Sequence, residues 1–126
     1  MASMFKEGVV SVWIATERPS GREDIEVLKD LCGVEYDDID SNEGYASDDG
    51  EPVDVLALLA PLSYSKSFAS AAVKRAEELG IVKGRWSVVQ YDFKYDRRKT
   101  VRPVADNPKF IGSFPFVEDE LPPWAR

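Results

Sequence analysis

The sequence contains no histidine and only one cysteine, Cys32, in 126 residues. Without histidine, the chain lacks the commonest general base and metal ligand of proteins, and every catalytic triad that depends on imidazole. A single cysteine forms no internal disulfide, so nothing indicates an oxidising compartment. Long apolar runs are also missing: VLALLAPL (55–62) is too short to cross a bilayer, and the N-terminus lacks the apolar stretch of a signal peptide. We therefore expect a soluble, cytoplasmic protein.

The length and the hydrophobic content predict a single folded domain. Hydrophobic residues make up 44% of the chain and aromatic residues 11%, which is enough apolar surface to oppose disorder of the whole chain. No repeat and no low-complexity linker divides the sequence. We expect one domain over residues 1–126.

Negative charge is concentrated in one segment, EYDDIDSNEGYASDDGEPVD (35–54). This segment holds nine carboxylates and no lysine or arginine, whereas the whole chain has 16 basic and 23 acidic residues and a net charge of −7. Without the segment the remaining residues are slightly basic. Such a local field repels nucleic acid and anionic membranes and steers a basic protein toward it. We therefore expect neither direct nucleic-acid binding nor membrane binding.

The acidic segment has an imperfect resemblance to a calcium-binding loop. Asp38, Asp40 and Asn42 fall at the first, third and fifth positions of an EF-hand. Glu43 stands where the loop requires glycine, and Asp49 stands where it requires a bidentate glutamate. The pattern does not predict a metal site, and no cofactor is expected. Paired carboxylates of the glycosidase type also need a buried acid, whereas this clustering indicates solvation.

Two interpretations of the acidic segment remain open: a solvated loop, or a surface that binds a basic protein. The second is favoured by Tyr36 and Tyr45, because rigid aromatic residues among steering charges are typical of interface hot spots. The stretch Glu118–Trp124 is a second candidate for the main contact surface. The residues that we expect to contact a partner are Tyr36, Asp37, Asp38, Asp40, Glu43, Tyr45, Asp48, Asp49 and Glu51.

Three further features have ordinary structural interpretations. SYSK (63–66) matches the S-x-x-K motif of penicillin-recognising enzymes, but the accompanying S-D-N and K-T-G motifs are missing, so we expect a loop-to-helix junction capped by Ser65 or Ser67. Cys32 ends an apolar helix face and should be a buried structural thiol. The cluster YDRRKTVR (95–102) should be an exposed hairpin tip, too small to bind nucleic acid.

The pattern of apolar residues predicts an α+β fold, a small, mainly antiparallel sheet with two to three helices packed on one face. GVVSVWIA (8–15) predicts a buried strand. The strand at 85–96 should bury one face, with Val89, Tyr91, Phe93 and Tyr95, and expose the other, with Gln90, Asp92 and Lys94. The strand at 109–117 should place Phe110, Phe114 and Phe116 on one face, with Pro115 at a sheet edge or at the end of the strand. Trp13, Tyr91, Phe93 and Phe114 are expected core residues. Helices are expected at about 21–32, ended by Gly33, at 53–60 before Pro61, and at 65–79 with Gly80 as the C-cap.

The order of these motifs resembles the immunity protein 22 family, small bacterial proteins encoded beside polymorphic toxins. The resemblance rests on GVVSVWIA, LKDLCGVEYDDID, LSYSKSFASAAVKRAEELGI, VVQYDFKYD and KFIGSFPF, in this order between about residues 8 and 117.

The resemblance implies a non-enzymatic inhibitor that binds a cognate toxin domain, often a nuclease, delivered by secretion or contact. Residues 35–54 suit this role, since carboxylates can cover the cations with which a nuclease holds phosphate. Two alternatives remain. One is a small enzyme that uses carboxylates or Ser63 and Lys66, and the other is an acidic mimic of nucleic acid that inhibits DNA-binding proteins in general.

Overall fold

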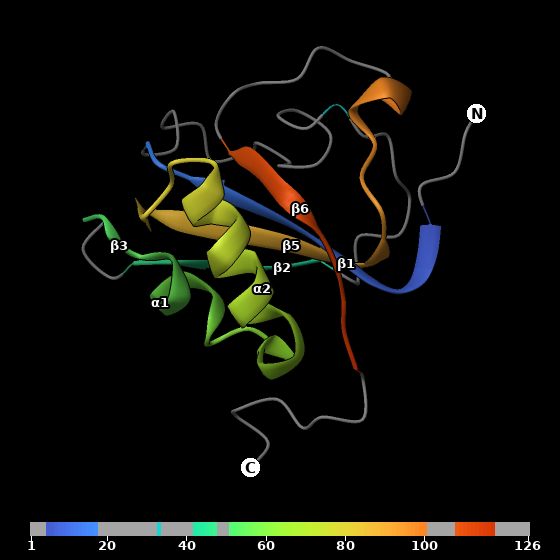
Figure 1. Cartoon of the computed structure of the whole chain (residues 1–126), viewed down its shortest axis with the longest axis horizontal. Coiled ribbons are helices and arrows are strands. Elements are labelled where there is room, and N and C mark those ends of the chain that lie inside the picture. The colour runs from blue at the N-terminus through green and yellow to red at the C-terminus, as the bar shows by residue number, and fades with distance from the viewer. Residues whose placement is uncertain (1–4, 18–32, 34–41, 48–50, 101–107, 118–126) are drawn as a thin grey trace.

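The computed structural model describes residues 5–17, 33, 42–47, 51–100 and 108–117. An antiparallel sheet of four strands has the order β2-β5-β1-β6, and a smaller sheet pairs β3 with β4. Figure 1 shows both helices, α1 and α2, over the same face of the larger sheet. This arrangement confirms the α+β class.

Along the chain, the elements are β1 (Phe5–Ala15), β2 (Asn42–Ala46), β3 (Val53–Asp54), α1 (Val55–Leu59), α2 (Ser65–Glu78), β4 (Lys83–Gly84), β5 (Trp86–Phe93), the 3-10 turn η2 (Arg97–Lys99) and β6 (Lys109–Pro115).

Both helices lie where the sequence predicts them. The short α1 ends just before Ala60 and Pro61, and α2 ends at Glu78, followed by Gly80 with a φ of 83°. Glycine accepts this left-handed conformation without the steric cost that a Cβ would bring. Neither helix has the length and apolar character needed to cross a bilayer. The expected helix at 21–32, with Cys32, lies outside the described residues; Gly33, expected to end it, has a φ of 73°.

The central strand β1 contributes to two separate cores because its side chains alternate between the two faces of the sheet. Val10, Val12 and Ile14 lie on the helix-covered face and pack with α1 and α2. Trp13 lies on the second face, where it packs with buried Val88, Phe93 and Tyr95. Both faces of β1 are therefore buried, as its continuous apolar sequence predicts.

The expected alternation along β5 is only half right. Val89 and Tyr91 lie on the helix-covered face, but Phe93 and Tyr95 belong to the Trp13 cluster of the second face. The side chains change face at Asp92, which has a φ of 54° and coincides with a register shift between β1 and β5. The expected exposure of Gln90 is also wrong, since its exposed fraction is 0%.

A similar irregularity divides the phenylalanines of β6. The pairing of β1 with β6 shifts register between Val12 and Trp13, so that Phe110 packs near Trp13 on the second face. Phe114 and Phe116 pack on the helix-covered face instead. The prediction that all three share one face was wrong, because a bulge reverses the alternation. Pro115 ends β6, an edge strand of the described sheet, as predicted.

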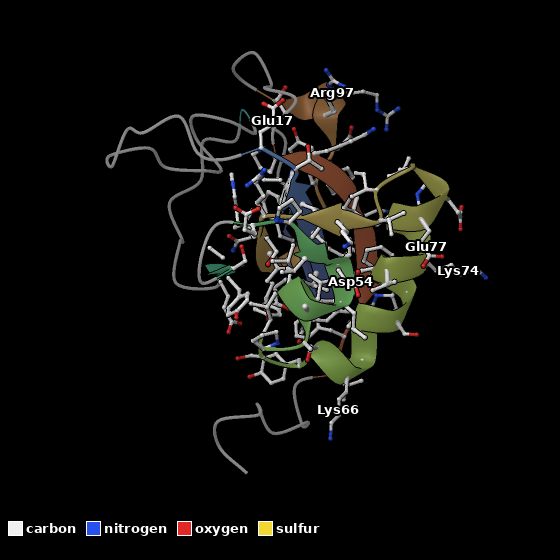
Figure 2. The ribbon with its side chains drawn as sticks, turned by 90° about the vertical axis from the view of Figure 1, so that its left-hand side faces the viewer. Glu17, Asp54, Lys66, Lys74, Glu77 and Arg97 are labelled. Atoms are coloured by element: carbon white, nitrogen blue, oxygen red, sulfur yellow. The ribbon has the colours of Figure 1, made fainter. Side chains whose placement is uncertain are left out.

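The basic cluster is not at a hairpin tip. Strands β5 and β6 lie on opposite sides of β1 and both run antiparallel to it, so the connection that contains η2 is a crossover that leads from the Val10 end of β1 back to its Ile14 end. Arg98 bonds back to Asp96, with its Nη2 atom 3.0 Å from Oδ2, and 90% of its side chain is exposed. Arg97 projects from this end of the molecule in Figure 2. The turn character of residues 97–99 is confirmed; their place in the topology is corrected.

Candidate functional site

The middle of the acidic segment forms an edge strand of the sheet. Residues Asn42–Ala46 constitute β2 and pair antiparallel with β5, from Asn42 opposite Gln90 to Ala46 opposite Trp86. The interpretation of this stretch as a solvated loop is therefore wrong for residues 42–46. A strand was not expected here because NEGYA contains no β-branched residue, and its charge dominated the sequence pattern.

Glu43 is half-buried, and its carboxylate bonds to the folded body. Its carboxylate accepts hydrogen bonds from the Ser63 backbone N–H (3.1 Å to Oε2) and the Ser63 hydroxyl (3.3 Å to Oε1). The Tyr91 hydroxyl lies 2.9 Å from Glu43 Oε2 and 2.6 Å from the Ser63 carbonyl oxygen, so its single proton is shared between two acceptors. This group, which we call the Glu43 cluster, joins β2 to β5 and to the α1–α2 connection.

The Glu43 cluster stabilises the fold and offers little to catalysis. Burial and, secondarily, the negative charge of Glu43 raise the pKa of the Tyr91 hydroxyl far above its ordinary value of 10.0. Tyr91 is therefore a neutral donor throughout the physiological pH range. Because donors already occupy both oxygens of Glu43, the carboxylate is poorly placed to take a proton from a substrate. Charge-assisted hydrogen bonds of this kind contribute about 1.5–3 kcal/mol each.

The backbone beside the Glu43 cluster adopts an uncommon conformation. Tyr64, the residue before α2, has a φ of 61°, which is unusual for a residue with a Cβ. Its ring packs on Tyr91 and Phe116, with ring centroids 5.6 and 5.7 Å apart. The Ser67 N–H donates to the Tyr64 carbonyl at 3.1 Å. These contacts hold Tyr64 in place, so the strain is explained by packing around Tyr91.

Ser63 and Lys66 do not form the geometry of an S-x-x-K nucleophile. Residues three apart share a helix face only when both lie on the helix, and α2 begins at Ser65, after Ser63. Lys66 is exposed and points away from the molecule at the start of α2, as Figure 2 shows. The expected serine cap is also wrong: Tyr64 is the N-cap residue and makes no side-chain cap bond, while the Ser65 and Ser67 hydroxyls donate to the carbonyls of Ala60 and Tyr64.

Of the remaining expected contact residues, the structure describes Tyr45 and Glu51. Tyr45 is half-buried and packs against the helix-side core, and Glu51 is exposed. Asp54, also exposed in Figure 2, precedes α1 without capping it. Tyr36, Asp37, Asp38, Asp40, Asp48 and Asp49, together with Glu118–Trp124, lie outside the described residues.

Within the described ranges, no group of three or more histidine, cysteine or acidic side chains is arranged to hold a metal ion. The later positions of the calcium-loop pattern, Asn42 to Gly44, belong to β2. A strand cannot supply the tight turn that an EF-hand loop needs at these positions. The earlier positions, Asp38 and Asp40, lie outside the description.

Sequence reasoning missed two features of this edge, the Glu43 cluster and the strand β2 itself, on which Gly44 and Ala46 are exposed. The first joins residues 48 apart in the sequence, Glu43 and Tyr91, and no local pattern predicts such a contact. The second has a weak signal: Glu43 and Tyr45 alternate with small residues, as on a strand with one covered face. Comparison of the chain with protein-family models, with curated proteins and with solved structures finds no match in any of the three.

Proposed function

We propose that this protein is a cytoplasmic immunity protein that binds and neutralises a cognate bacterial toxin domain through its acidic edge. The toxin class that best fits the charge is a nuclease of a polymorphic toxin system. The sequence resemblance to the immunity protein 22 family suggested this function, and the geometry of residues 42–54 supports it.

The supporting observation is that the acidic segment is anchored to the folded body at two points. Asn42–Ala46 pairs with β5, and Val53–Asp54 pairs with β4. The Ser47 hydroxyl also donates to the Glu51 carbonyl at 2.7 Å, which closes the chain between these strands. Glu51 and Asp54 are exposed on this scaffold, and side chains held in this way lose little conformational entropy when they meet a partner. A freely moving acidic loop would lack this advantage.

The charge of the segment suits an inhibitor of a nucleic-acid enzyme. A nuclease presents lysine and arginine side chains to phosphate groups. The eight carboxylates of the segment other than Glu43 have no neighbouring cation in the sequence, so they can occupy the same surface and speed association by electrostatic steering. Steering of this type acts over a Debye length of about 8 Å at physiological salt, so it weakens as salt is added.

The experiment uses the C-terminal domain of the large secreted protein that we expect the immediately upstream gene to encode. Co-expression with the full chain should restore growth to cells that produce this domain, and the purified proteins should form a complex. The variant Asp38→Lys, Asp40→Lys, Asp48→Lys should keep the wild-type melting temperature and associate at least about tenfold more slowly at low salt. The matched control, Glu7→Lys, Glu77→Lys, Glu78→Lys, makes the same change in net charge at exposed sites outside the segment.

Equal slowing in both triple variants would contradict a role for the acidic edge, because net charge alone would then explain it. Failure of the full chain to protect cells or to bind the upstream domain would overturn the proposed function. Inhibition of unrelated basic nucleases with similar strength would indicate a general mimic of nucleic acid.

A further inference from the structure

The two edges of the main sheet differ in how well they are protected. Strand β6 ends in Pro115, carries a register shift against β1 and is contacted by α2. Proline, bulges and a covering helix are the devices that keep an edge strand from pairing with other chains. Strand β2 has neither proline nor bulge: its five residues, NEGYA, contain no proline or lysine, and its pairing with β5 is regular, although α1 contacts it.

The backbone of Gly44 and Ala46 points away from the sheet. Ser47 donates its N–H to the Arg85 carbonyl at 3.1 Å, which places the hydrogen-bonding groups of residues 43, 45 and 47 toward β5. By the alternation of an antiparallel pair, the N–H and C=O groups of Gly44 and Ala46 face outward. Both residues are exposed, and these outward groups form no hydrogen bond among the residues that the structure describes.

The side chains of β2 leave room for another strand. Glu43 and Tyr45 turn toward the helix-covered face, where Glu43 bonds to Tyr91 and Ser63 and Tyr45 packs on the core. Gly44 and Ala46, on the opposite face, have no bulky side chain. Among the described residues, a strand that approaches this edge therefore displaces no large side chain, and the Glu43 cluster holds β2 in register while it pairs.

From the exposed backbone and regular pairing of β2, we propose that this strand accepts a strand of the toxin domain that bears lysine and arginine. The added strand extends the sheet by main-chain pairing along Asn42–Ala46. The inference rests on the proposed function and adds the mode of binding. Pairing through the main chain gives affinity, and charges flanking the strand select the partner. The sequence neighbours of β2, which include Asp40, Asp48 and Asp49, are acidic.

A second copy of this chain fits the edge poorly. Pairing β2 with itself would bring together two segments that each carry nine carboxylates and no lysine or arginine. Like charges on neighbouring strands destabilise pairing, whereas opposite charges favour it. The acidic residues thus protect the edge from self-association and leave it open to a basic strand.

The test uses as its probe a synthetic peptide of alternating lysine and valine, about ten residues long. Titrated into the full-length protein at low salt, it should shift the backbone amide resonances of Gly44 and Ala46. A peptide of the same sequence that is N-methylated at every peptide nitrogen keeps the charge but has no N–H donors, and it should bind at least about tenfold more weakly. A tenfold change corresponds to about 1.4 kcal/mol, the scale of one or two hydrogen bonds.

The protein variant is Ala46→Pro, matched by Ala46→Ser. Proline removes an outward N–H and spares the bonds to β5, so it is tolerated at such an edge position. Ala46→Pro should bind the unmodified peptide at least about tenfold more weakly, and Ala46→Ser should bind it like the wild type. If Ala46→Pro does not fold, the comparison of the two peptides on the wild-type protein decides. Equal binding of both peptides, shifts confined to other strands, or no binding at millimolar peptide would overturn the inference.

The same variants separate this inference from the proposed function. If the wild-type protein and a folded Ala46→Pro variant protect cells from the upstream toxin domain equally well, strand pairing is refuted and the immunity function is supported. If the wild-type protein pairs with the basic peptide at β2 but neither binds nor neutralises that toxin domain, the pairing edge is supported and the immunity function is refuted.

Discussion

Replacing Tyr91 with phenylalanine isolates the contribution of the Glu43 cluster. The substitution deletes one hydroxyl, which lies 2.9 Å from Glu43 Oε2 and 2.6 Å from the Ser63 carbonyl, and it leaves the ring contacts with Tyr64 and Phe116 in place. A hydrogen bond to a charged group contributes about 1.5–3 kcal/mol, so we expect the free energy of unfolding to fall by that amount. With an unfolding entropy of about 2.1 cal/mol/K per residue, a chain of 126 residues should melt about 6–11 °C lower.

The measurement is urea and thermal unfolding followed by circular dichroism. Tyr45→Phe is the matched control, because Tyr45 is half-buried on the neighbouring strand and its hydroxyl has no hydrogen bond within the described residues. The control should change stability by less than about 0.5 kcal/mol. If Tyr91→Phe also lost less than about 0.5 kcal/mol, the Glu43 cluster would not stabilise β2, and the account of this edge would fail.

The raised pKa of Tyr91 predicts how the stability of the protein responds to alkaline pH, and Tyr91→Phe tests this prediction. The pKa of Tyr91 is raised in the folded protein above its ordinary value of 10.0, so the folded state keeps a proton that the unfolded state loses above pH 10. The stabilisation is therefore fully present below pH 10 and declines as the pH rises above it. Because the unfolded tyrosine is already half ionised at pH 10, the deficit of Tyr91→Phe relative to the wild type should narrow by about 1 kcal/mol between pH 10 and pH 11. A constant deficit over this interval would show that Tyr91 ionises normally.

Three other variants test the description of the fold and the site. Phe93→Ala should lose about 3–5 kcal/mol in urea unfolding, because Phe93 is 1% exposed in the second core; a normally stable variant would contradict its assignment to that face. Gly84→Ala should lose about 1–3 kcal/mol, since a Cβ there lies 2.6 Å from Ile14 Cγ2 and 3.1 Å from the Ala15 carbonyl; an unchanged melting temperature would refute this packing. Lys66→Ala should keep both its melting temperature and its protection of cells, and a loss of protection alone would favour the enzyme alternative.

The sequence predicted those elements whose signals are local. The continuous apolar residues of 8–15 predicted β1, and Pro61 and Gly80 marked the ends of α1 and α2 within about a turn. Along α2, Phe68, Ala72 and Ala76 are buried at the four-residue spacing that places side chains on one helix face. For these elements, the periodicity of apolar residues and the residues that end helices were sufficient for the prediction.

The errors in assigning the side chains of β5 and β6 to a face arose where each strand changes face. Alternation assigns a side chain to a face only while the backbone stays regular, and the positive φ of Asp92 breaks it between Tyr91 and Phe93. The contacts that hold this bulge are distant in the sequence. Gly8 donates its N–H to Asp92 Oδ1 at 3.0 Å, and the Ser11 hydroxyl donates to the Phe93 carbonyl at 2.7 Å. Both contacts form only when β1 pairs with β5, so no local pattern contains them.

The candidate site was predicted by its charge, and charge does not distinguish a carboxylate that supports the fold from one that meets a partner. Glu43 has the same sequence signature as its acidic neighbours, yet its oxygens bind Ser63 and Tyr91. A change at Glu43 would remove negative charge and loosen β2 together, so slower association would not identify a steering role. Charge reversal at Asp38, Asp40 and Asp48 spares the Glu43 cluster. An effect of that variant on association at an unchanged melting temperature can therefore be attributed to charge, and the separate variant Ala46→Pro then tests the strand edge itself.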